Sequence, residues 1–201
     1  MKMYKRIFAL ILVLALAMSL AGCGEIKKAE ASVNGMFMSF KNLDFDEAQK
    51  YVNIEDIVNG DEANANTQLI MKTVFGNLDY EIVASNKVDN NNVVVKTKIT
   101  ATDMKPVMSE FLTKALQYAF SNAFANPQPT EEETNKKMEE ILVECAAKPD
   151  LATVTNEVDI KVIKTESKEW KIEADDAFIN ALLGGLADAT KEMENNFNTE
   201  E

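Results

Sequence analysis

Histidine is absent from the 201-residue chain, and its absence removes several kinds of chemistry. Without imidazole there is no general base that titrates near neutral pH, no serine-histidine triad and few ways to build a zinc site. The sequence also lacks a P-loop and a glycine-rich dinucleotide fingerprint. We therefore predict no cofactor and no metal site.

Positive charge is scarce, because the chain has 21 Lys and Arg residues and 33 Asp and Glu residues, which gives a net charge of −12. Such a body repels nucleic acid, so we expect no nucleic-acid partner. The acidic residues are scattered along the chain, which is typical of a solvated surface. They leave carboxylate-based catalysis open, because a pair of Asp or Glu residues suffices for some hydrolases.

The N-terminus has the order of residue types found in export signals. Lys2, Lys5 and Arg6 precede an apolar run over residues 7–20, and small residues follow. As a helix this run would span roughly 21 Å, which is short of the roughly 30 Å core of a bilayer. We predict a cleaved signal peptide over residues 1–22.

The run ends in Leu20-Ala21-Gly22-Cys23, which resembles the bacterial lipobox. This resemblance implies that Cys23 carries the lipid and becomes the first residue of the mature protein. Two acyl chains would hold it at the cell membrane, on the extracytoplasmic face. Residues 23–30 would form a flexible tether, and cleavage would change the net charge to −15. The alternative is a chance cysteine after an ordinary secretory signal.

With Cys23 modified, the chain could form no internal disulfide. The other cysteine, Cys145, shares a helical period with Met138, Ile141 and Leu142. The pattern favours a buried thiol, with a reactive nucleophile as the alternative.

Residues 31–187 are expected to form one α+β domain, which begins with helices. The first helix is predicted by apolar residues at helical spacing, namely Val33, Met36, Phe37 and Phe40. Asp44 with Glu47 predicts the start of a short second helix that runs through Val52. A third helix is expected over 62–75.

Strands are expected where apolar residues alternate with polar ones. Residues 80–84 and 93–99 flank the turn formers Asp89 to Asn92, and residues 158–162 and 170–172 flank a second turn at 166–169. Two antiparallel hairpins would supply a four-stranded sheet.

Between the hairpins, apolar residues from Met108 to Phe124 form a broad helical stripe, which predicts the main core helix packed against the sheet. Thr130 with Glu133 predicts the cap of a further helix. A closing helix should start at Asp175 or Asp176 and end at Gly184-Gly185. We expect residues 188–201 to be a flexible acidic tail.

The signal, the helices, the strand pairs and the closing segments 169–172 and 176–184 resemble uncharacterised lipoproteins of low-GC Gram-positive bacteria. The resemblance implies a cystatin-like, or nuclear transport factor 2-like, curved antiparallel sheet packed on helices. It supplies no catalytic residues.

Two functions remain open. The first is a non-catalytic binding or scaffolding module for a small apolar ligand, a peptide or a surface protein, whose aromatic lining would come from Tyr80, Phe111, Tyr118, Phe120 and Trp170. The alternative is a carboxylate-based hydrolase or isomerase, which needs an inward-facing acid; Asp79, Asp103 and Asp159 border or interrupt strands.

Overall fold

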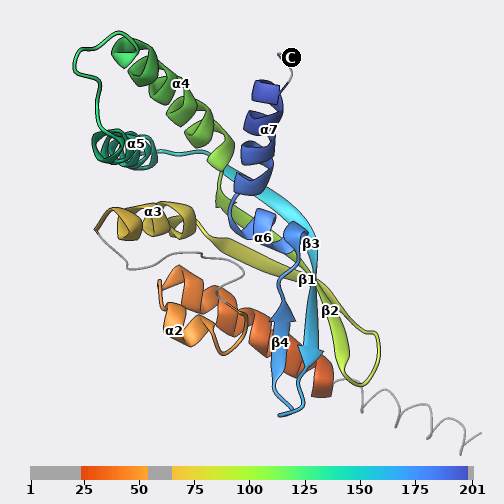
Figure 1. Cartoon of the computed structure of the whole chain (residues 1–201). Helices are drawn as coiled ribbons and strands as arrows, with labels where there is room; N and C mark the ends of the chain where they lie inside the picture. The colour runs from red at the N-terminus through yellow and green to blue at the C-terminus, as the bar shows by residue number, and fades with distance from the viewer. Residues whose placement is uncertain (1–23, 54–64, 199–201) are drawn as a thin grey trace, which may run out of the picture.

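The computed structural model describes residues 24–53 and 65–198 of the chain (Figure 1). The expected signal peptide, Cys23 and the start of the helix predicted over 62–75 lie outside the described residues. Within them, no helix is both long enough and apolar enough to cross a membrane.

Four antiparallel strands form a single sheet in the order β1-β2-β3-β4. The strands are β1 (Asp79–Lys87), β2 (Asn92–Thr102), β3 (Thr153–Lys164) and β4 (Trp170–Glu173). The alternating pattern of the sequence sets their register, and a bulge between Ile82 and Ala84 interrupts it in β1. The predicted α+β class and both predicted hairpins are confirmed.

One face of the sheet is covered by the N-terminal helix, which occupies residues 24–41 of the described chain. Val33, Phe37 and Phe40 lie on its buried side, and the Phe37 ring stacks on Tyr80 of β1 at 4.3 Å between centroids. The helical spacing of apolar residues explains this contact, because residues three and four apart share one helix face. This helix is the central core helix of the fold.

The N-terminal helix already includes residues that were expected to be a tether. Residues 24–30 are helical, Ala29 is fully buried, and Glu25 forms ion pairs with Lys87 and Lys164. The flexible tether predicted over residues 23–30 is therefore wrong for residues 24–30, because apolar burial and ion pairs hold them on the sheet.

Two short helices follow. In α2 (Phe45–Ala48) the Asp44 carboxylate accepts a hydrogen bond from the Glu47 N–H, as the sequence predicted. The helix ends at Ala48 rather than at Val52, because Val52 pairs with Ile172 and protects the edge of β4. Next, α3 (Ala65–Gly76) leads directly into β1.

The sheet has two different ends. At the turn end, which we define as residues 24–28, 87–92 and 163–171, the start of the N-terminal helix meets both hairpin turns, and the Lys164 N–H donates to the Asn91 carbonyl. At the opposite, helical end lie α4 (Met104–Asn122), α5 (Glu131–Ala146), α6 (Asp176–Leu182) and α7 (Leu186–Asn198) (Figure 1).

The prediction that the helix after β2 packs on the sheet as the main core helix is wrong. Only Met104 and Val107, in its first turn, are buried. The rest of α4 projects away from the sheet and contacts α5 and α7 (Figure 1). The apolar stripe predicted the helix correctly, but the N-terminal helix already occupies the sheet face.

The acidic tail predicted from residue 188 is also wrong as far as residue 198. The Asp188 N–H donates to Asn180, Ala189 is buried, and Lys105 pairs with Glu192 at 2.8 Å. These contacts hold α7 against α4 and α6.

The outer face of the sheet carries side chains of alternating charge. Lys98 lies across from Glu81 and Glu157 in the register, and Lys96 contacts Glu157 at 3.4 Å and Asp159 at 3.8 Å. Cross-strand pairs of opposite charge suit a face that meets water. The face therefore needs no covering element.

Candidate functional site

The two most exposed large apolar side chains of the described residues, Phe120 and Phe124, lie near the end of α4 and just beyond it, and Leu116 is exposed one turn before Phe120. Leu116 and Phe120 are four residues apart, so they share a face of α4, and Phe124 follows four residues later in the turn after the helix. Phe120 is 75% exposed, Phe124 is 97% exposed, and Leu116 is 37% exposed. We call this set the aromatic face.

Tyr118 points the other way, toward α5. It lines a hollow of about 370 Å³ together with the loop residues Pro127 to Pro129 and Glu133 of α5. The α5 start is fixed by a full capping box, in which Glu133 N–H donates to Thr130 Oγ1 and Thr130 N–H donates to the Glu133 carboxylate. This anchored turn keeps the aromatic face on the outside of the α4–α5 hairpin.

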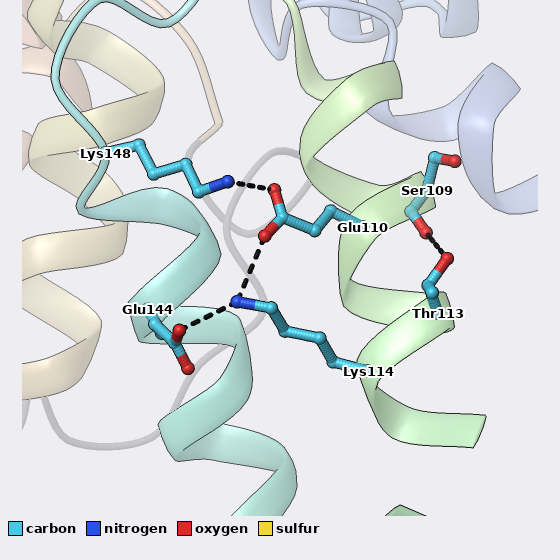
Figure 2. Close-up of polar contacts among 6 residues, drawn as sticks. All are labelled: Ser109, Glu110, Thr113, Lys114, Glu144 and Lys148. Carbon is cyan, nitrogen blue, oxygen red and sulfur yellow. Dashed lines mark hydrogen bonds and ion pairs between the residues drawn. The ribbon is translucent and has the colours of Figure 1, made fainter. Parts of the chain in front are cut away.

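Ion pairs fasten α4 to α5 closer to the sheet (Figure 2). Lys114 of α4 contacts Glu144 of α5 at 2.8 Å and Glu110 at 3.0 Å, and Lys148 contacts the other oxygen of Glu110 at 2.5 Å. The hydrogen bond from Lys148, followed by that from Lys114, holds the pKa of Glu110 below its ordinary value. Hydrogen bonds from Lys114 to Glu144 and Glu110 raise the pKa of Lys114.

A second hollow, of about 510 Å³, lies between α3 and the end of α5. Lys72, Asn77, Lys148 and Asp150 give it a mixed polar lining. Lys148 is already paired with Glu110, and Asn77 donates to Thr102. Two of these four polar side chains are therefore engaged with the protein itself.

The five aromatic residues predicted to line one ligand site do not come together. Tyr80 and Trp170 lie beneath the N-terminal helix, where Tyr80 donates to Asn34 and the Trp170 carbonyl accepts from Ser32. Phe111 packs against the core, Tyr118 faces α5 and Phe120 is exposed. Phe120 is the member of that set that belongs to the aromatic face.

Leu116 and Phe124 were expected in the buried stripe of the helix and lie at the surface instead, although the sequence carries a signal for this. Residues 115–130 contain no charged side chain in a chain that is 27% charged, and Glu131 to Glu133 follow at once. A neutral apolar stretch that ends in an acidic turn is unusual for a solvated hairpin.

The acids considered for catalysis are occupied at the surface. Asp79 pairs with Lys41 at 3.1 Å, and the hydrogen bond from Lys41 lowers the pKa of Asp79. Asp103 caps α4 through the Lys105 N–H, and Asp159 lies near Lys96 on the outer face. Wherever a carboxyl pKa shift is resolved among the described residues, the shift is downward.

Cys145 is buried in α5, as predicted. Burial raises the pKa of its thiol, which keeps it protonated. Within residues 24–53 and 65–198, no three Cys, Asp or Glu side chains are grouped so that they could hold a metal ion.

No protein-family model matches the chain, and no curated protein matches it. Among solved structures, the chain superposes on the candidate lipoprotein YcdA of Bacillus subtilis with a TM-score of 0.41 and 17% identity. The superposition covers 59% of this chain and 38% of YcdA, so it spans well under half of that protein. A TM-score of this size does not establish a common fold.

Proposed function

We propose that the protein is a membrane-anchored extracytoplasmic lipoprotein whose domain binds a protein partner and does not catalyse a reaction. The membrane part of the proposal rests on the signal-like residues 1–22 and on the lipobox-like segment that ends at Cys23. The binding part rests on the aromatic face.

The exposure of Phe120 and Phe124 is the observation that carries the binding function. Single exposed apolar residues are common on folded proteins, but neighbouring large ones mark interaction sites. Aromatic side chains contribute much of the energy of protein interfaces, because they bury a large area at little cost in conformational entropy.

The partner that fits this surface is a protein segment with both apolar and basic residues. The first turn of α5 exposes Glu131 and Glu132 where the uncharged stretch 115–130 ends. Lysine or arginine side chains on the partner would meet these carboxylates while its apolar residues cover Phe120 and Phe124. An anionic membrane would be repelled by the same carboxylates.

The position of the aromatic face agrees with display away from the membrane. The α4–α5 hairpin projects from the helical end (Figure 1), whereas Glu25, two residues after Cys23, pairs with Lys87 at the turn end. A lipid on Cys23 would therefore leave the aromatic face pointing outward.

Catalysis by carboxylates is less well supported. A general acid at neutral pH needs a raised pKa, which burial among apolar groups supplies. The lowered carboxyl pKa values at Glu25, Asp79 and Glu110 belong to acids paired with lysine. Such acids stay ionised and bound to their partners.

Site-specific photo-crosslinking in the host would test the binding function. A photoreactive residue in place of Phe120 should give a discrete protein adduct, and the same residue in place of Asp159, on the outer face of the sheet, should not. The change Phe124→Ser should abolish the adduct, while Val83→Ser, which removes another exposed apolar side chain, should leave it intact. Equal adducts from positions 120 and 159 would refute the proposal.

Metabolic labelling with a tagged fatty acid would test the anchor. The natural chain should take up label and sediment with membranes, and Cys23→Ala should take up none. Label on the Cys23→Ala variant would contradict the assignment of the lipid to this residue.

A further inference from the structure

The stretch of chain between the expected lipid on Cys23 and the folded domain is very short. Helix is already present at Gly24, one peptide bond after Cys23, and consecutive Cα atoms are about 3.8 Å apart. A lipid on Cys23 would thus hold the turn end against the bilayer, within the reach of a few residues. The side chains at that end must then be compatible with lipid head groups.

The turn end differs in charge from the rest of the protein. Its three segments hold six lysines and four carboxylates, a local charge of +2, whereas the chain without residues 1–22 carries −15. One of the four carboxylates, Glu25, is already neutralised, because it pairs with Lys87 and Lys164.

Three lysines of the turn end remain available to a ligand. Lys27, Lys28 and Lys168 are exposed, and none of them has an ion-pair partner among the described side chains. Lys27 and Lys28 come from the first turns of the N-terminal helix, and Lys168 from the turn between β3 and β4. Two distant parts of the sequence therefore supply unpaired positive charge to one end of the fold.

An apolar side chain lies at the same end. Val88, in the turn between β1 and β2, is 64% exposed. Unpaired lysines and an exposed aliphatic side chain at one end of the fold match the border of an anionic bilayer, where ammonium groups meet phosphates and apolar groups enter the head-group layer.

From these observations we propose that the turn end is a membrane-docking surface, in which Lys27, Lys28 and Lys168 bind anionic phospholipid head groups and Val88 enters the interface. The proposal rests on the lipid anchor proposed above and adds an orientation to it. The acidic bulk of the domain and the α4–α5 hairpin then point away from the membrane, which keeps the aromatic face free for a protein partner.

The test uses the full mature lipoprotein, purified from its host and reconstituted into vesicles of phosphatidylcholine with or without phosphatidylglycerol. An environment-sensitive fluorophore is attached to Val88→Cys, and in a second sample to Ser121→Cys on the α4–α5 hairpin. The parent protein is the labelling control, since its Cys145 is buried. Spin-labelled lipid should quench the probe at position 88 in phosphatidylglycerol vesicles, with a blue shift, and leave the probe at position 121 unquenched.

Charge reversal then identifies the lysines. The triple variant Lys27→Glu, Lys28→Glu and Lys168→Glu should lose the quenching that depends on phosphatidylglycerol. The matched triple Lys72→Glu, Lys136→Glu and Lys191→Glu changes the net charge equally at exposed positions outside the turn end and should keep it. Circular dichroism of both triples verifies folding.

Flotation of the vesicles separates the two proposals. Protein that fails to float with vesicles would overturn the lipid anchor and the docking surface together. Protein that floats while position 88 remains unquenched, or is quenched equally in both kinds of vesicle, would overturn the docking surface and leave the anchor standing.

Discussion

Gly184 lies where α6 ends and the chain turns toward α7, with a φ of +60°. A Cβ atom at this position would lie 1.7 Å from the Thr102 carbonyl oxygen, and the Gly184 carbonyl accepts a hydrogen bond from the Met104 N–H. Both close contacts involve the end of β2 and the start of α4, so they cannot be relieved by a side-chain rotation. Gly184 therefore holds the helical end together.

We predict that Gly184→Ala lowers the free energy of unfolding by at least about 3 kcal/mol, since a clash with backbone adds to the strain of a positive φ. Gly185→Ala is the matched control. Its φ is +80°, but its Cβ would meet only the end of Lys105 at 4.0 Å, so a loss of about 1–2 kcal/mol is expected. Urea unfolding measures both values, and equal losses would contradict the steric argument.

At the residue scale, the features that the sequence predicted correctly are local ones. The caps at Asp44, Thr130 and Asp175 and the stop at Gly184-Gly185 depend on side chains within a few residues. The burial of Cys145 followed from the period of its own helix. The exposure of Phe120 could not be predicted from neighbouring residues, because it depends on whether another element of the fold covers that face of the helix.

At the element scale, ion pairs hold α4 to α5, because few buried residues join the outer parts of these helices. Glu110 lies between Lys114 and Lys148, and Glu144 and Cys145 face the same cluster from α5. The pKa of Glu110 is lowered by folding, so this residue stabilises the folded state above its ordinary pKa. The contribution disappears as pH falls through the lowered pKa.

We therefore predict that the melting temperature of the protein decreases as pH is lowered from 7 to below the ordinary Glu value of 4.5, and that Glu110→Gln has a smaller decrease. At pH 7 the variant should be less stable than the natural protein, and the difference should shrink in acid. Glu166→Gln, at an exposed residue in the β3–β4 turn, should follow the natural protein throughout. Calorimetry at several pH values measures this, and a constant deficit for Glu110→Gln would contradict the prediction.

The strands and hairpins could be predicted at this scale, whereas the packing of α4 could not. Period-two alternation in β2 and β3 reports one buried face directly, and the polar turns at Asp89 to Asn92 and at Glu166 to Glu169 mark where each hairpin reverses. An apolar stripe on a helix indicates only that another element covers that face, and it does not identify the element. The N-terminal helix and α4 carry similar apolar stripes, and the sequence does not show which of the two packs on the sheet.

At the scale of the whole molecule, burial is unequal between the sheet and the α4–α5 hairpin. The N-terminal helix, β2 and β3 supply most of the fully buried large side chains, while no residue of α4 beyond Val107 is buried. Local opening costs least where it exposes few buried apolar groups to water. The hairpin should therefore open more readily than the sheet it is attached to.

Hydrogen exchange would measure this difference. Amides of residues 116–122 in α4 should exchange at least about tenfold faster than those of β2 or of residues 33–40, a difference of about 1.4 kcal/mol in opening free energy. The ion pairs at Glu110 and Lys114 should divide α4, so that amides before Lys114 exchange more slowly than those after it. Uniform protection along α4, equal to that of β2, would show that the hairpin unfolds only with the whole domain. A hairpin that opens by itself could instead adjust the aromatic face to a partner while the turn end stays fixed at the membrane.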